Sequence, residues 1–224
     1  MLNPSNTGFL KSHLHDEKGN RVRWNQAYEP FLAGALKVSQ RVADWPYLPW
    51  VPFAVMRQLS RFLASKQCRV LEYGSGRSTV WLAQRSFHVV SIENSEAWHE
   101  KVSVVLKKQR LNNVDYRFLT GEDYIKPPGF ADGTFDLIII DGILRSKCLE
   151  NVHGMLKAGG CLYLDNSDTD MASPDGDMRK AEGTMRSLAQ EWSVRLEFYT
   201  GYCPGNLHPH QGALLRKPAS SYVH

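Results

Sequence analysis

The spacing of hydrophobic and polar residues predicts a regular succession of strands and helices from residue 68 onward. Short apolar runs, typical of buried strands, occupy residues 68–73, 87–93, 114–120, 135–141 and 161–165. Between and after them, helical spacing of apolar residues covers 78–85, 95–110, 145–156 and 176–191. Strands that alternate with helices predict a parallel sheet with helices on both faces.

The end of the chain departs from this alternation. Residues 194–200 and 212–217 are expected to form two successive strands, joined by a loop rich in glycine, proline and histidine. With no helix between them, the two strands most simply pair antiparallel. The expected fold is therefore α/β, with a seven-stranded, mostly parallel sheet whose final strand is antiparallel.

The region before the sheet is predicted to be a helical extension. We expect residues 1–23 to be polar and loose, 24–44 to form one helix or two short ones, and 53–65 to form another helix. The stretch WPYLPWVPF at 45–53 is too rich in proline for a helix or a central strand. Its aromatic residues Trp45, Tyr47 and Trp50 either pack against the core or cover a substrate pocket.

These patterns divide the chain into three parts. Residues 1–65 form an N-terminal extension with a helical, aromatic cap, residues 66–217 the sheet domain, and residues 218–224 a tail.

Composition adds few constraints on partners and location. Hydrophobic residues make up 42% and charged residues 22%, and the net charge of +4 does not demand an anionic partner. The four cysteines show no CxxC spacing, which favours reduced thiols. The N-terminus has no apolar core, and no run of about 18 apolar residues occurs. We therefore expect a cytoplasmic protein without a membrane or nucleic-acid partner.

The end of the first predicted strand, VLEYGSG, has the features of a nucleotide site. Parallel α/β sheets bind ligands at the carboxyl ends of their strands, and Gly74 and Gly76 would let a ligand approach the backbone. Glu93 ends the second strand about 20 residues after Glu72, where a carboxylate can accept both hydroxyls of a ribose. This spacing predicts an adenosine-containing cofactor. The alternative is a plain sheet whose acidic residues only cap helices.

Two cofactor classes fit this position differently. A dinucleotide motif would have its third glycine at position 79, which is Thr79. The carboxylate of Glu72 would repel a pyrophosphate but would suit a cationic ligand such as a sulfonium. The sequence therefore favours S-adenosylmethionine over a nicotinamide, and an NAD(P)-dependent oxidoreductase is kept as an alternative.

At this point the chain resembles the S-adenosylmethionine-dependent methyltransferases of the Rossmann-like fold. The likeness rests on VLEYGSG, VVSIEN, GEDY, FDLIIIDG and LKAGGCLYLDN in this order, and covers about residues 66–216. It implies that Glu72, Gly74 and Gly76 cradle the methionine part of the cofactor, with Ser78 in place of the family's third glycine. Glu93 would bind the ribose.

The same resemblance implies contacts with the adenine. Asn94 would lie beside the ring, and Glu122 or Asp123 would face its amino group. For Glu122 and Asp123 a surface turn is the alternative.

Acidic residues at two further strand ends suggest a metal. Asp141, Asp165 and Asn166 offer oxygen ligands of the kind that Mg²⁺ or another divalent cation prefers. This arrangement resembles the catechol and caffeoyl-coenzyme A O-methyltransferases, but their lysine three residues after the aspartate is Leu144 here. Alternatively, Asp141 and Asp165 orient substrate or loop without metal. Asp141 is also expected in the catalytic and cofactor sites.

The resemblance and the strand ends together favour transfer to oxygen. The chain lacks the Asn/Asp-Pro-Pro-aromatic motif that accompanies methylation of nucleic-acid bases. His208 and His210 could take the proton of a hydroxyl, or lie in an exposed loop. We expect O-methylation of a small molecule or of a glycan or secondary-metabolite precursor, by a chain that could form a homodimer. A non-catalytic cofactor-binding protein of the same fold is a further alternative.

Overall fold

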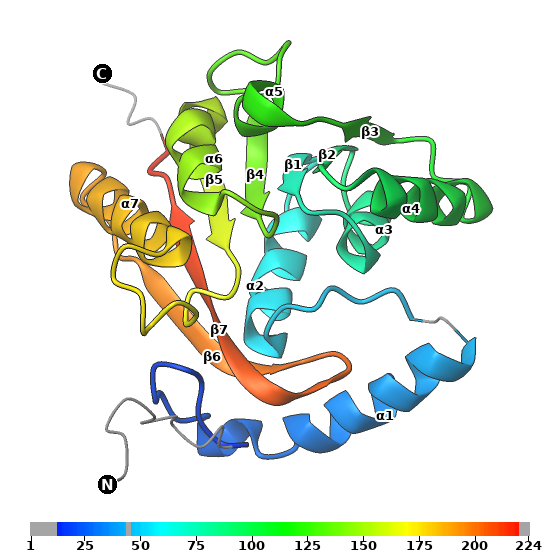
Figure 1. The fold of residues 1–224 in the computed structure, drawn as a ribbon, viewed down its shortest axis with the longest axis vertical. Helices are drawn as coiled ribbons and strands as arrows, with labels where there is room; N and C mark the ends of the chain where they lie inside the picture. The colour runs from blue at the N-terminus through cyan, green and yellow to red at the C-terminus, as the bar shows by residue number, and fades with distance from the viewer. Residues whose placement is uncertain (1–12, 44–45, 220–224) are drawn as a thin grey trace, which may run out of the picture.

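The computed structural model describes residues 13–43 and 46–219 and contains a seven-stranded sheet with the order β3-β2-β1-β4-β5-β7-β6 (Figure 1). The strands are β1 Arg69–Tyr73, β2 His88–Glu93, β3 Val114–Phe118, β4 Phe135–Ile140, β5 Leu156–Leu164, β6 Glu197–Cys203 and β7 Asn206–Arg216. The first five pair in parallel, and β7 runs antiparallel to both β5 and β6. The predicted fold class is confirmed.

Helices cover both faces of this sheet. They are α1 Glu29–Ala43, α2 Phe53–Ala64, α3 Arg77–Ala83, α4 Glu96–Lys108, α5 Gly121–Ile125, α6 Arg145–Val152 and α7 Asp177–Glu191, with short 3-10 turns at Trp24–Gln26 and His153–Met155. Among the described residues, no helix is long and apolar enough to cross a membrane.

Alternate residues of the strands feed two separate cores. Leu71 and Ile138 pack with residues of α6 and α7 on one face, whereas Val70 and Leu137 pack with residues of α2 and α3 on the other. This alternation follows from the pleat of a strand, which points successive side chains to opposite faces. Both faces of the central strands are therefore buried, as their continuous apolar runs predicted.

The prediction of a long loop between the last two strands is wrong. β6 and β7 extend through most of it, and only Pro204 and Gly205 lie between them. The pairing is irregular between Gly201 and Cys203, beside Pro209, and such an irregularity accommodates a residue without an amide donor. His208 and His210 therefore lie in a strand, where their placement is fixed by pairing.

Several boundaries also differ from the sequence-based expectations. α5 was not predicted, and α6 ends at Val152 instead of 156. β5 starts at Leu156 instead of residue 161 and runs through Gly159 and Gly160. In Figure 1, α1 lies along the β6–β7 hairpin, away from the parallel part of the sheet.

Candidate functional site

The turn between β1 and α3 brings the ends of β1 and β4 together. Gly74 has φ +83°, and a Cβ atom there would lie 2.6 Å from the backbone oxygen of Asp141. Only glycine accepts both the left-handed backbone and this close approach. The amide of Asp141 in turn donates to the carbonyl of Tyr73. The glycine turn therefore fixes where Asp141 stands relative to the end of β1.

A cavity of about 350 Å³ opens beside this turn. Its lining comprises Trp50, Gly74, Ser75, Gly76, Arg77, Ser78, Glu93, Asn94, Trp98, Asp141, Gly142 and Ile143. Six residues expected at the cofactor site are among them: Gly74, Gly76, Ser78, Glu93, Asn94 and Asp141. Glu122 and Asp123 lie exposed in the first turn of α5 and do not line the cavity, so their adenine contact stays a prediction.

Glu72 lies behind the cavity wall instead of lining it. Its side chain is fully buried, and Oε2 accepts hydrogen bonds of 2.6 Å from both Thr79 and Ser91. Within the described part of the chain, Oε1 has no hydrogen-bond partner. Burial raises the pKa of Glu72 to about 7, although nearby hydroxyl groups oppose the shift. Glu72 is therefore poised to change its charge near neutral pH.

Glu93 lines the cavity with its carboxylate already held by the chain. Oε1 accepts from the amides of Asn94 and Ser95, both at 2.9 Å, and Oε2 accepts from the Ser75 hydroxyl at 2.7 Å. The same hydroxyl lies 2.7 Å from the phenol oxygen of Tyr116. Oε2 also accepts from the amide of Ser75 at 3.2 Å, so each oxygen has two donors and the rotamer of Glu93 is fixed. The Ser75 contact was not foreseen from the sequence.

Trp98 is a lining residue that the sequence did not reveal. Its position in α4 suggested packing with the apolar helix face, but the side chain is about half exposed. The indole Nε1 donates to the carbonyl of Ser75 at 2.8 Å, which places the ring at the cavity wall. An exposed tryptophan with its one donor occupied offers a flat apolar surface to a ligand.

A second cavity of about 280 Å³ lies next to the first. It is lined by Trp50, Asp141, Asp165, Asn166, Cys203, Gly205, Asn206 and His210. Trp50 and Asp141 line both cavities, so these two residues form the shared wall. Trp50 is 61% exposed, whereas Tyr47 is buried in the core, and Trp45 falls outside the described residues. Of the three aromatic residues, Trp50 alone is placed to cover a pocket within the described part of the chain.

His210 lines this second cavity and carries a buried nitrogen with no hydrogen-bond partner in the described part of the chain. The side chain is buried, and Nε2 finds no partner among the residues that the structure describes. Burial lowers the pKa of His210, while the charges of Asp168 and Asp141 oppose the shift. A neutral imidazole is therefore favoured at pH 7, and its unprotonated nitrogen can accept a proton.

Asp165 is held next to His210 by a tyrosine. The hydroxyl of Tyr163 donates to Oδ1 of Asp165, and burial keeps the pKa of Tyr163 well above its usual range. Burial also raises the pKa of Asp165. The amide of Asp165 donates to the carbonyl of Ile140, which anchors the end of β5 to that of β4. Tyr163 therefore supplies a permanent donor to this carboxylate.

His208 does not share this environment. It lies two residues earlier in β7, exposed to solvent, and its ring stacks on that of His13 at 4.6 Å. It does not line either of the two cavities. The structure thus separates the two histidines that the sequence left as equal candidates.

The residues expected to bind a metal do converge, but an arginine lies among them. Asp141 and Asn166 both line the second cavity with Asp165. Nη2 of Arg145 lies 3.2 Å from Oδ1 of Asp141 and 3.3 Å from Oδ1 of Asn166. Across the described residues, no group of three or more His, Cys, Asp or Glu side chains is placed to hold a metal ion. As they stand, these residues do not fit a divalent cation.

Asp168 and Asp170, which could have extended a metal site, have structural partners. Oδ1 of Asp168 accepts from the amide of Gln211 at 2.9 Å, and Oδ2 accepts from the amide of Glu17 at 3.1 Å. Oδ2 of Asp170 accepts from the amide of Met178, in the first turn of α7. Asp168 therefore ties the loop after β5 to β7 and to the N-terminal segment, and Asp170 bonds the start of α7.

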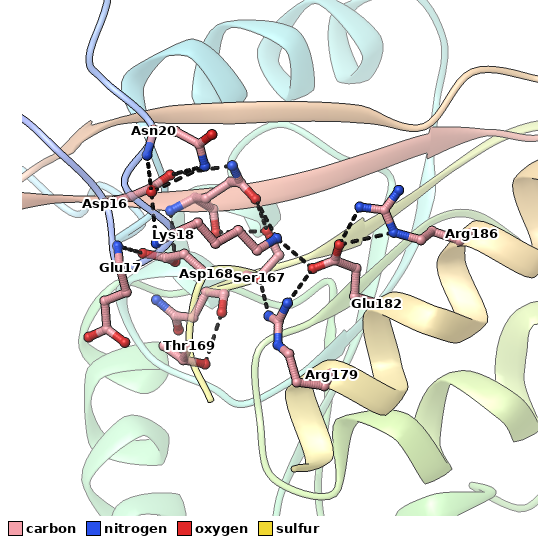
Figure 2. Close-up of polar contacts among 12 residues, drawn as sticks. Asp16, Glu17, Lys18, Asn20, Ser167, Asp168, Thr169, Arg179, Glu182 and Arg186 are labelled. Atoms are coloured by element: carbon pink, nitrogen blue, oxygen red, sulfur yellow. Dashed lines mark hydrogen bonds and ion pairs between the residues drawn. The ribbon is translucent and has the colours of Figure 1, made fainter. Parts of the chain in front are cut away.

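Residues 13–20 form an N-terminal strap that docks against β6, β7 and α7, contrary to the expectation of a loose segment. Figure 2 shows Lys18 reaching Glu182 of α7, with Nζ 2.5 Å from Oε2. Oδ2 of Asp16 accepts from Thr200 at 2.6 Å. Gln211, next to His210 in β7, bonds Asp16 and Lys18. The strap therefore braces the strand that carries His210.

Comparisons with known proteins bear on this arrangement. A family model described as a methyltransferase domain matches residues 64–209. No curated protein matches the sequence significantly.

Solved structures share the fold at low sequence identity. An O-methyltransferase from Bacillus cereus in complex with SAH has a TM-score of 0.63 at 18% identity, covering 82% of this chain and 89% of that chain. A candidate caffeoyl-CoA O-methyltransferase from Staphylococcus aureus has a TM-score of 0.60 at 17% identity, covering 87% and 100%. A SAM-dependent methyltransferase from Aquifex aeolicus has a TM-score of 0.52 at 17% identity, covering 81% and 98%. At these identities the likeness concerns the fold alone.

Proposed function

The chain belongs to the methyltransferase domain family, and from this premise we propose that it transfers the methyl group of S-adenosylmethionine to a hydroxyl oxygen. The proposed acceptor is a small molecule or a glycan or secondary-metabolite precursor. Family membership confirms the expected enzyme class and disfavours the nicotinamide-dependent alternative. The solved neighbours described as O-methyltransferases support oxygen as the acceptor atom.

The cavity beside the glycine turn is the proposed cofactor site. Its features suit a cationic adenosine ligand: a bare backbone at Gly74 and Gly76, the carboxylate of Glu93, and the unpaired, buried oxygen of Glu72 behind the wall. A positive ligand would favour the ionised form of Glu72, which burial disfavours in its absence. When bound, S-adenosylmethionine supplies a methyl group activated by its sulfonium.

The second cavity is the proposed acceptor site. A hydroxyl held there would lie near His210, whose unpartnered Nε2 can take its proton as the oxygen bonds to the methyl carbon. Asp165 stands beside the imidazole and stabilises the charge that the proton creates. Trp50 covers both cavities and limits the access of water to the transfer path.

The wall that the two cavities share is the main support for the proposed methyl transfer. Because Asp141 and Trp50 line both cavities, a group held in one lies beside a group held in the other, as in-line transfer requires. A divalent cation, considered for this wall from the sequence, is left out because Arg145 already bonds the oxygens it would use.

The test is production of S-adenosylhomocysteine by the purified full chain. The protein is incubated with S-adenosylmethionine and a panel of phenols, polyols and sugar nucleotides, and product is followed by mass spectrometry. Acceptor-dependent product that is lost in His210→Gln supports the proposal. Tight cofactor binding without product from any acceptor would favour the non-catalytic alternative. We also propose the three-part division of the chain, a homodimer and a cytoplasmic location.

A further inference from the structure

The side chain of Arg145 fills the space between the ends of β4 and β5. Its Nε donates to the carbonyl of Gly142 at 2.8 Å, and Nη1 donates to the carbonyl of Asp165 at 2.6 Å. Nη2 bonds Oδ1 of Asp141, and both Nη atoms lie within 3.4 Å of Oδ1 of Asn166. The guanidinium thus bonds side-chain oxygens that the sequence marked as metal ligands.

Each donor of this guanidinium has an acceptor within the chain. A guanidinium has five N–H groups in a planar fork, and it cannot lose its proton in a protein. Nε donates its one hydrogen to Gly142. Nη1 donates to Asp165 and Asn166, and Nη2 donates to Asp141 and Asn166. No donor remains for a substrate, so Arg145 acts through the residues it holds.

Neighbouring residues fix the direction in which Arg145 points. Leu144 takes a left-handed backbone with φ +49°, and its own side chain is exposed. The amide of Arg145 donates to Oδ2 of Asp177 at 2.7 Å, and Ser146 donates to Oδ1 through both its amide and its hydroxyl. Asp177 belongs to α7, so a second helix anchors the start of α6. The side chain of Arg145 is largely shielded from solvent.

We propose that Arg145 is a positioning residue that takes the place of a divalent cation at the acceptor site. It holds the Asp141 carboxylate in the wall shared by the two cavities and the Asn166 amide in the wall of the acceptor cavity. A second cation is disfavoured, because it would meet the positive charge of the guanidinium and would have to compete for the same oxygens. The acceptor site therefore works without a divalent cation.

A direct test of cation binding uses Mn²⁺ alone, titrated into metal-stripped full-length protein and followed by electron paramagnetic resonance. Wild type is expected to leave Mn²⁺ in solution, whereas Arg145→Ala binds one ion per chain. Arg145→Lys keeps the charge and should behave as wild type. The matched control Lys147→Ala removes an exposed positive charge from the same helix and should also leave Mn²⁺ unbound. One Mn²⁺ bound per wild-type chain, or none bound by Arg145→Ala, would overturn the proposal.

A second test rests on the proposed methyl transfer. Wild-type turnover should be unchanged by EDTA or added Mg²⁺, and Arg145→Ala should lower kcat about tenfold or more while the S-adenosylmethionine Kd changes less than about twofold. Arg145→Lys should restore part of kcat, and Lys147→Ala should match wild type. Loss of wild-type turnover on chelation would contradict the proposal.

The two tests separate two kinds of failure. If wild type transfers no methyl group to any acceptor, the proposed function fails, but the Mn²⁺ titration still decides the role of Arg145. If Arg145→Ala does not fold, the Mn²⁺ titrations of wild type and Arg145→Lys still decide it.

Discussion

Nε2 of His210 lies 4.0 Å from Oδ1 of Asp165, at the side of the acceptor cavity. This distance exceeds that of a hydrogen bond, and the Tyr163 hydroxyl already donates to the same oxygen. The imidazole therefore lies close enough to feel the charge of the carboxylate, while no hydrogen bond to a described residue occupies Nε2. With Nε2 unoccupied and a carboxylate nearby, His210 can accept a proton.

Replacing His210 should remove the proposed base. We expect His210→Gln to lower kcat by about 10²–10⁴-fold, the usual contribution of a general base, with a smaller effect on cofactor affinity. His208→Gln is the matched control, because it changes a histidine of the same strand that is exposed and lines neither cavity. Steady-state kinetics with the acceptor found in the panel measure both. Equal losses in the two variants would argue against His210 as the base.

The pH profile of the reaction follows from the same residue. Burial lowers the pKa of His210, so the imidazole stays neutral and competent as pH falls through the usual range of histidine. With S-adenosylmethionine saturating, so that the ionisation of Glu72 does not limit binding, we expect kcat/KM of wild type for the acceptor to hold steady between pH 7 and about 6.5 and to decline only in more acidic solution. A profile that rises steeply above pH 7 would contradict a base with a lowered pKa.

Glu72 should tie cofactor binding to pH. Because its pKa lies at about 7 in the ligand-free chain, the fraction that is ionised rises about tenfold between pH 6 and 8. A cationic ligand favours the ionised form, so the affinity for S-adenosylmethionine should rise with pH over this window and binding should release protons. Glu72→Gln should weaken binding about tenfold or more at pH 8 and flatten the dependence. Calorimetry in buffers of different ionisation enthalpy measures both effects.

The strap should contribute to stability through Glu182. This carboxylate is buried and bonds Lys18, Arg179 and Arg186 (Figure 2). Glu182→Gln leaves Lys18 without its ionic partner and should cost about 3–5 kcal/mol, the usual penalty for breaking a buried pair. Lys18→Met should cost less, because two arginines still face Glu182 and because burial already lowers the pKa of Lys18. Chemical denaturation compares the two variants, and a larger loss in Lys18→Met would contradict this ranking.

Acid should weaken the contribution of Glu182 and its ionic partners to the stability of the fold. Burial alone would raise the pKa of Glu182, but the bonds from Lys18 and Arg186 outweigh it and lower the pKa below its usual 4.5. A group with a lowered folded pKa stabilises the fold above its unfolded pKa, and this contribution is lost as pH falls through the folded value. The difference in unfolding free energy between wild type and Glu182→Gln should therefore shrink below about pH 4.5. A constant difference down to pH 3 would contradict it.

The parallel part of the sheet could be predicted because its strands are continuous apolar runs. Leu71 and Ile138 are buried whichever helix covers them, so local hydrophobicity determines their state. The antiparallel pairing of the last two strands was predicted, but their extension through the expected loop was missed. Pro209 and two histidines do not look like strand residues, and pairing of this part of β7 with β6 overrides their propensity. The strap was missed for a related reason: Asp16 and Lys18 are polar, and only their distant partners Thr200 and Glu182 order them.

Most of the residues expected at one site do line the first cavity, whereas the lining of the second cavity was expected only in part. Gly74 and Glu93 follow strands directly, so topology places them at the carboxyl edge of the sheet. Arg145 was not expected at the site, because the position of the family's lysine, three residues after Asp141, is Leu144. The left-handed backbone of Leu144, which turns Arg145 into the site, has no signal in a leucine. The unpartnered nitrogen of His210 likewise depends on packing that no local pattern encodes.

Calorimetric titration of the full chain with S-adenosylmethionine, S-adenosylhomocysteine and NADH tests the central claim most directly. We predict that both sulfur nucleotides bind with one site per chain and that NADH does not bind. NADH binding in their place would contradict the reading of Glu72 and the proposed transfer of a methyl group. Absence of binding by all three would remove the cofactor cavity from the account.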